Sequence, residues 1–233
     1  MNKQIVVFLL SVFFIVPAHA EIIKTNGDGS GVPVTIDITE GEHWKHFMWV
    51  SKIIPVWNRP QIAVWAETPG GDFITTLYVT HRSATQNWRG GNVRRPGSLP
   101  YWSHRRGVEY SDGYYMPPKD APLPDTMTAA TPKQGFTLES NLHANADSIV
   151  VFVEANHSFD TNDAFPKKTG GVNGQPSAVY RAVVDCATLP ATAAFSLAGY
   201  GSPDGSDGKL YTDTEKLTTG KDIVGDMTVT VGE

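Results

Sequence analysis

Six arginines fall in a part of the chain that contains no acidic residue. No Asp or Glu occurs between Phe73 and Val108, and the arginines there are Arg82, Arg89, Arg94, Arg95, Arg105 and Arg106. A guanidinium is a planar fork of N–H donors that suits phosphate and carboxylate groups, and nearby aromatic rings stack on planar ligands. This pattern favours an anion site whose candidate contacts are Arg94, Arg95, Arg105 and Trp102. The alternative is a solvated basic loop whose arginines pair locally.

Two imidazoles and a thioether also lie close together in the sequence, at His43, His46 and Met48. These groups are ligands for copper, so the segment is a candidate metal site. On a helix the two histidines share a face, whereas on a strand they do not. The apolar neighbours Trp49 and Ile54 favour instead a segment that packs in the core. Both interpretations stay open at this point.

Composition narrows the class of protein. The chain has 233 residues, with 19 Lys and Arg against 24 Asp and Glu, which gives a net charge of −5. We therefore expect no nucleic-acid partner. The single cysteine, Cys186, excludes a disulfide framework and a four-cysteine zinc site. The 22 Gly and 16 Pro residues indicate many turns and few long helices.

Residues 1–20 have the three parts of a secretory signal peptide. Lys3 supplies a positive charge, residues 5–16 are apolar apart from Ser11, and residues 17–20 end in a small-x-small pattern. We expect cleavage after Ala20, a mature chain that begins at Glu21, and a periplasmic location. No later stretch reaches the roughly 20 apolar residues that cross a bilayer, so we expect no membrane span in the mature form.

Short β-rich segments separated by Gly and Pro dominate residues 21–233. The expected strands are 32–39, 61–67, 73–80, 136–138, 148–155, 178–185, 193–197 and 227–231. Residues 69–72 (PGGD) are a hairpin signal between two of them. The pattern predicts one all-β domain, an Ig-like antiparallel β-sandwich with long irregular loops. The two longest loop inserts are expected at about 83–131 and 156–177.

The segment DTMTAAT, from Asp125 to Thr131, resembles the acceptor sequence of extracytoplasmic proteins that FAD:protein FMN transferase modifies. In those proteins the last threonine carries FMN through a phosphoester bond. The resemblance implies that Thr131 bonds to FMN, and that Thr128, Asp125 and the small Ala130 help the transferase to accept the segment. Prolines on both sides are expected to keep the segment out of helix and sheet, and therefore exposed.

The wider sequence resembles a widespread bacterial periplasmic family of unknown function. The resemblance spans residues 60–224 and includes LPYWSHRRG, ANHSFDTNDAF and NGQPSAVYRAVVD. It implies an Ig-like sandwich and an association with extracytoplasmic flavin electron transfer. The leading hypothesis is a periplasmic electron-transfer protein that carries covalent FMN and meets a periplasmic or membrane redox partner. The alternatives are a non-enzymatic Ig-like binding or scaffolding module of the cell envelope and a periplasmic metal-handling protein.

Overall fold

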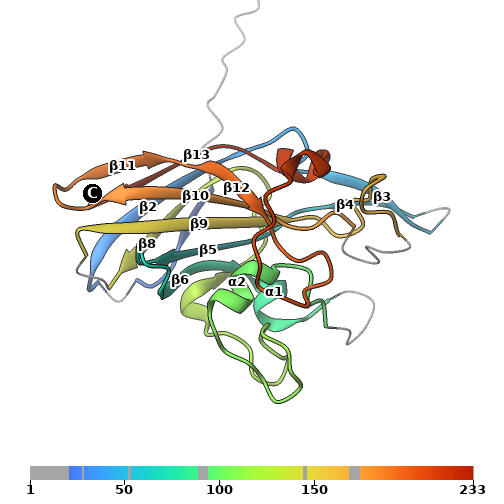
Figure 1. Ribbon diagram of the computed structural model, residues 1–233, viewed down its shortest axis with the longest axis horizontal. Helices are drawn as coiled ribbons and strands as arrows, with labels where there is room; N and C mark the ends of the chain where they lie inside the picture. The colour runs from blue at the N-terminus through green and yellow to red at the C-terminus, as the bar shows by residue number, and fades with distance from the viewer. Residues whose placement is uncertain are drawn as a thin grey trace, which may run out of the picture.

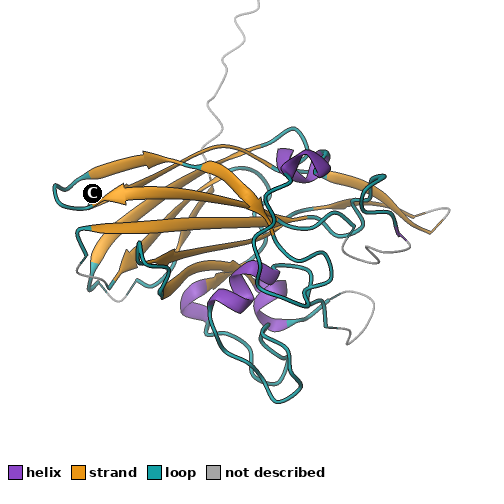
Figure 2. Ribbon diagram, viewed as in Figure 1, coloured by secondary structure: helices purple, strands orange, loops and turns teal. Residues whose placement is uncertain are grey.

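The computed structural model describes residues 21–27, 29–51, 54–88, 94–143, 146–167 and 174–232. The expected signal peptide, residues 1–20, lies outside this part of the chain, as does Arg89. The described residues form two β-sheets packed face to face, with two short helices beside the second sheet (Figure 1, Figure 2). No described helix is long and apolar enough to span a membrane.

The first sheet has the strand order β1-β8-β2-β13-β11. Its strands are β1 (Glu21–Lys24), β2 (Val32–Glu40), β8 (Phe136–Leu142), β11 (Ala191–Ala194) and β13 (Val224–Val231). The second sheet has the order β12-β10-β9-β5-β6-β7. Its strands are β5 (Gln61–Glu67), β6 (Phe73–Thr80), β7 (Thr128–Ala129), β9 (Ser148–Asn156), β10 (Ala178–Asp185) and β12 (Ser196–Tyr200). The pairs β1–β8 and β6–β7 are parallel, and the other pairs described in these sheets are antiparallel.

A further hairpin extends beyond both sheets (Figure 1). It consists of β3 (His46–Ser51) and β4 (Ile54–Asn58). The helical elements are α1 (His81–Thr85), α2 (Pro100–Arg105) and the 3-10 turns η1 (Asp125–Met127), η2 (Thr214–Lys216) and η3 (Thr219–Asp222).

The core between the sheets follows from a period of two in the strand sequences. In β2, Val34, Ile36 and Ile38 are at most 2% exposed, whereas Asp37 is exposed. Successive side chains of a strand point to opposite faces, so this alternation turns one face of β2 inward. That face packs with apolar side chains of the second sheet, such as Val64 in β5.

The second sheet is buried on both faces, which explains the continuous apolar sequence of β5. All of the residues of β5 are buried. One face meets the first sheet, and the other is covered by Leu99 and Trp102 from the segment around α2. On this covered face, Trp65 stacks on Phe152 with ring centroids 5.0 Å apart. The long segment after β6 therefore acts as a second cover, because a sheet with two apolar faces must bury both.

The expected all-β sandwich with long irregular loops is confirmed, and the strands at 61–67, 73–80 and 178–185 have the expected bounds. Residues 193–197 were expected as one strand, but they are divided between β11 in the first sheet and β12 in the second. Core packing was the favoured interpretation of the segment around His46 and Trp49, but this segment forms the outlying hairpin instead.

The expectation that prolines keep residues 125–131 out of helix and sheet is also wrong. Residues 125–127 form η1, and residues 128–129 join the edge of the second sheet as β7. The physical reason is that Pro124 and Pro132 bracket this segment and do not interrupt it. The backbone N–H groups between the two prolines stay available for pairing.

Candidate functional site

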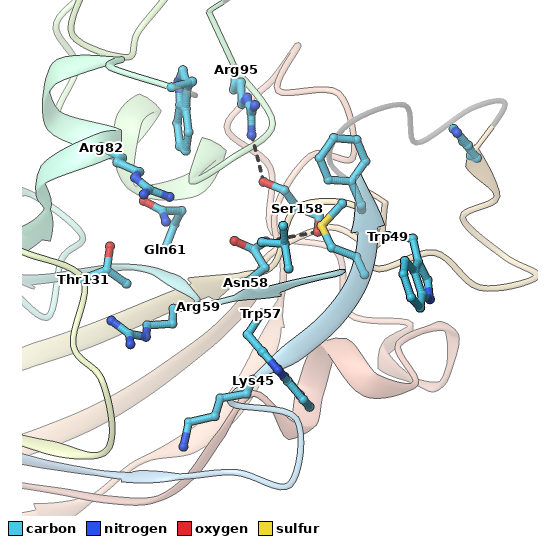
Figure 3. A pocket seen from close by; sticks show the side chains of 15 residues that line it. Lys45, Trp49, Trp57, Asn58, Arg59, Gln61, Arg82, Arg95, Thr131 and Ser158 are labelled. Atoms are coloured by element: carbon cyan, nitrogen blue, oxygen red, sulfur yellow. Dashed lines mark hydrogen bonds between the residues drawn. The ribbon is translucent and has the colours of Figure 1, made fainter. Parts of the chain in front are cut away.

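A cavity of about 990 Å³ lies between the β3–β4 hairpin, the segment after α1 and the end of β9 (Figure 3). Sites for small molecules usually have volumes of about 300–1,000 Å³, so this cavity has room for one. Its polar walls include Asn58, Gln61, Thr131 and Ser158. Its aromatic walls are Trp49, Trp57, Trp88 and Phe159.

The cavity is positively charged. Its cationic side chains are Lys45, Arg59, Arg82, Arg95 and Lys167. None of its described lining residues is Asp or Glu, although the whole chain has a net charge of −5. Clustered cations in a cleft with partly apolar walls attract anions more strongly than they do on an open surface. The cavity therefore suits an anionic ligand with a planar ring.

Gln86 organises the wall that contains Trp88 and Arg95. It follows α1 in the left-handed conformation, with a φ of 51°, and its Nε2 donates to the Ser83 carbonyl oxygen at 2.9 Å. Its Oε1 accepts from the Trp88 indole at 2.9 Å and from the Arg95 backbone N–H at 3.1 Å. The Arg95 guanidinium lies over the Trp88 ring, 4.4 Å from its centroid. One amide side chain thus positions both residues.

Arg95 also reaches across the cavity to the segment after β9. Its Nη1 donates to Ser158 Oγ at 3.1 Å, and the Ser158 carbonyl oxygen accepts from the Asn58 amide at 3.3 Å. Next to Ser158, Phe159 is 37% exposed and has a φ of 66°. A bulky residue rarely adopts this backbone conformation, and Phe159 lines the cavity.

Thr131 lies half-buried in the same wall as Arg59, Arg82 and Gln61 (Figure 3). Within the described part of the chain, its hydroxyl has no hydrogen-bond partner. The sequence candidates that share the cavity are therefore Thr131, as the predicted FMN acceptor, and Arg95, as a predicted anion contact.

The rest of the predicted acceptor segment is held by the edge of the second sheet. Thr128 and Ala129 pair with β6 through two residue pairs, Val79 with Thr128 and Thr80 with Ala129. Asp125 and Ala130 are exposed, and the Ala130 carbonyl oxygen accepts from the Tyr78 hydroxyl at 3.4 Å. The segment is accessible at both ends, but its middle must leave the sheet before an enzyme can extend it.

Arg94 contacts its own loop, and it does not line the cavity. It forms an ion pair with Asp112 and donates to the Met116 carbonyl oxygen. Its guanidinium also lies 5.0 Å from the centroid of the Tyr114 ring. Arg94 therefore fits the alternative interpretation, in which the arginines of the basic loop pair with residues of their own loop.

Arg105 and Trp102 lie on α2, where they cover the outer face of the second sheet. The Arg105 guanidinium donates to both carboxylate oxygens of Glu67, at 2.7 and 2.6 Å, and this hydrogen bonding raises the pKa of Arg105. Glu67 also accepts from the Trp65 indole at 2.7 Å. Trp102 is 1% exposed, and its indole donates to the Thr76 hydroxyl at 3.1 Å. Neither residue lines the cavity, and a buried indole is not free to stack on a ligand there.

The three candidate metal ligands lie on two different local structures. His46 and Met48 share a face of β3, whereas His43 lies in the turn before it. The ring next to His46 is that of His157, with 5.9 Å between the centroids. Among the described residues, no group of three or more His, Cys, Asp or Glu side chains is placed to share a metal ion.

Two deeply buried titratable groups lie near the end of β9. The Glu154 carboxylate accepts from the backbone N–H groups of Tyr101 at 3.1 Å and Trp102 at 2.7 Å, and burial raises its pKa to about 7. His157 Nε2 donates to the carbonyl oxygens of His43 at 3.0 Å and Trp44 at 3.1 Å. Burial first, and the nearby His46 second, lower the pKa of His157 to about 4.

We expect these two groups to act on stability in opposite directions as the pH changes. The pKa of Glu154 is about 4.5 in the unfolded chain and about 7 in the folded protein. Its contribution to the stability of the folded state is therefore full below pH 4.5 and is lost as the pH rises to about 7. Unfolded His157 titrates near 6.5, so its contribution is full above that pH and is lost as the pH falls towards 4.

As the pH falls from 6.5 to 4.5, the free energy of unfolding of His157→Gln should therefore rise by about 2–3 kcal/mol relative to that of the wild type. Over the same range, the free energy of unfolding of Glu154→Gln should fall by about 2–3 kcal/mol relative to that of the wild type. Urea unfolding of both variants at several pH values measures these slopes. Parallel pH profiles in the two variants would contradict the assignment.

Several wall residues carry no motif and were not found from the sequence. Asn58 ends β4, Gln61 begins β5 and Ser158 follows the residue after β9. Each is a polar residue beside an apolar strand end, and strand ends and loops are where binding groups are usually placed. That position is the signal that could have located them.

Comparisons with protein-family models, with curated proteins and with solved structures find no match to this chain. The resemblances of residues 60–224 and of the segment from Asp125 to Thr131 therefore stay predictions.

Proposed function

We propose that the protein is a periplasmic electron-transfer protein that carries FMN on Thr131, with the flavin held in the cationic cavity. One observation carries the proposal. Thr131, the last residue of the acceptor-like segment, lines a cavity with five cationic side chains and no described carboxylate. FMN joins a planar ring to a phosphate, and guanidinium groups and indoles bind such ligands.

The attachment proposed here uses FAD as the co-reactant and FAD:protein FMN transferase as the catalyst. A bond forms between Thr131 Oγ1 and the phosphorus atom of the FMN part of FAD. The bond from that phosphorus to AMP breaks, AMP leaves, and the hydroxyl proton is released. The reaction requires an unengaged hydroxyl, which agrees with the Thr131 side chain in the described part of the chain.

After attachment, the residues of the cavity would supply binding and electrostatics. Arg59 and Arg82 lie on the same side of the cavity as Thr131 and would favour the phosphodiester charge (Figure 3). Burial lowers the pKa of Arg95, yet a guanidinium keeps its proton at neutral pH and so favours negative charge on the ring. The bound flavin would supply the redox chemistry itself.

Expression of the wild-type chain together with the transferase tests the proposal. We expect the intact mass to rise by one FMN per chain and the band to fluoresce on a denaturing gel. A known acceptor protein in the same cells confirms that the transferase works. If that control gains FMN and this chain does not, the proposal is wrong and the non-enzymatic binding module becomes the favoured function.

A further inference from the structure

Residues 21–26 contact the backbone at both ends of the acceptor-like segment, and we call them the arm. Near the start of the segment, the Asn26 backbone N–H donates to the Thr126 carbonyl oxygen at 2.7 Å. Two residues after its end, the Glu21 carboxylate accepts from the Lys133 backbone N–H at 3.1 Å. The arm therefore fixes the chain on both sides of the segment's centre.

The arm bridges the edges of the two sheets. Its strand β1 pairs with β8 of the first sheet through four residue pairs. The Thr25 hydroxyl donates to the carbonyl oxygen of Leu77 in β6, at 2.6 Å. The Asn26 side-chain amide donates to the carbonyl oxygen of Thr76, also in β6, at 3.2 Å. Because β7 pairs with the same strand β6, the arm and the acceptor-like segment share one sheet edge.

The strand of the arm contributes little to the core. Ile23 is 6% exposed, whereas Ile22 is 56% exposed and Lys24 is also exposed. Among the described strands of the first sheet, β1 lies at one edge and pairs only with β8. Segments with few buried apolar contacts open locally at a lower cost than core strands do. The arm can therefore detach while the rest of the sandwich stays folded.

A cavity of about 510 Å³ is lined by both the arm and the start of the acceptor-like segment. Among its lining residues are Asn26, Asp125 and Thr126. Protein interiors are otherwise close-packed, and side chains beside a cavity lack contacts on one side. Few contacts must therefore break when the arm moves away from the segment.

We propose that the arm is a latch that controls the access of FAD:protein FMN transferase to Thr131. The inference rests on the proposed function and adds its regulation. With the arm docked, Thr126 is bonded to Asn26, and residues 128–129 stay in the second sheet. The transferase must draw the Thr131 hydroxyl into its own site, so it needs flanking backbone that can move. Release of the arm breaks the bonds from Asn26 and Glu21 and leaves that backbone less constrained.

A disulfide between β1 and β8 tests the latch, with the chain purified without FMN and then incubated with transferase and FAD. Ile22 pairs with Thr137, and neighbouring strands have the spacing that a disulfide needs. Ile22→Cys with Thr137→Cys is made in a Cys186→Ala background, which leaves no other thiol. We expect the oxidised variant to gain FMN about tenfold or more slowly than the same protein after reduction, as measured by intact mass over time.

Thr192→Cys with Thr230→Cys, in the same background, is the matched control. It locks β11 to β13 at the other edge of the same sheet, where the two native hydroxyls lie 3.0 Å apart. Its oxidised and reduced forms should gain FMN at equal rates. Conversely, Thr25→Val removes a hydroxyl that holds the arm to β6, and it should speed attachment about fivefold.

Hydrogen exchange, measured without the transferase, separates the latch from the proposed function. The backbone amides of residues 126–131 should exchange more slowly in the oxidised Ile22→Cys, Thr137→Cys variant than in its reduced form. Equal exchange and equal rates of FMN attachment in these two forms overturn the latch and leave attachment to Thr131 standing. If the lock slows exchange but no variant gains FMN, the proposed function is wrong, and the latch on it falls too.

Discussion

Thr131→Val is expected to abolish FMN attachment completely in cells that contain the transferase. The phosphoester needs the side-chain oxygen, and valine keeps nearly the shape of threonine without it. Thr131 is half-buried and lies outside β7, so the variant should stay folded. Intact mass spectrometry of the purified variant measures the result.

Two neighbouring variants separate attachment from recognition. Thr128→Val and Asp125→Asn should slow modification and not abolish it, because these side chains are proposed to help recognition. Only two residue pairs hold β7 to β6, so loosening this edge for the transferase should need little free energy. If Thr131→Val still gains FMN, another hydroxyl is the acceptor, and peptide mapping would identify it.

Arg105→Met is expected to destabilise the protein by about 3–5 kcal/mol, because it leaves a buried carboxylate without its cation. The Glu67 side chain is 3% exposed, and Arg105 donates to both of its oxygens. The hydrogen bond from the Trp65 indole stays, but it does not neutralise the charge. Urea unfolding measures the free energy of each variant.

Removal of the charge should restore stability in the same background. Arg105→Met with Glu67→Gln should regain most of the loss, because a neutral amide still accepts from Trp65. Arg181→Met, at an exposed position of β10, is the control and should stay within about 0.5 kcal/mol of the wild type. If Arg105→Met alone were as stable as Arg181→Met, the Glu67 charge would need no cation.

The strand framework could be predicted from the sequence because its signals are local. In β2 the alternation of apolar and polar residues records which face is buried, and the expected strands at β5, β6 and β10 needed only such patterns. The PGGD turn has the same local character. Gly71 has a φ of 91°, a conformation that glycine adopts without steric cost.

The tertiary structure decided which partners the arginines contact. Arg94, Arg95 and Arg105 belong to one basic loop, yet Arg105 pairs with Glu67, 38 residues away, and Arg95 bonds to Ser158, 63 residues away. Such partners meet only through the order of strands in the second sheet and the way the loop covers it. Residue type predicted the kind of contact, but it carried no information about the partner.

Trp102 and Trp57 show the same division between sequence and tertiary structure. Both are tryptophans in segments with apolar neighbours, yet Trp102 is 1% exposed and Trp57 is 64% exposed. The sequence by itself determined strands such as β2, β5, β6 and β10, the turn after β5 and the acceptor-like motif, because each depends on neighbours along the chain. The exposure of an indole depends on what faces it. Trp102 lies against the outer face of the second sheet, whereas Trp57 lies on a hairpin that extends past the sandwich.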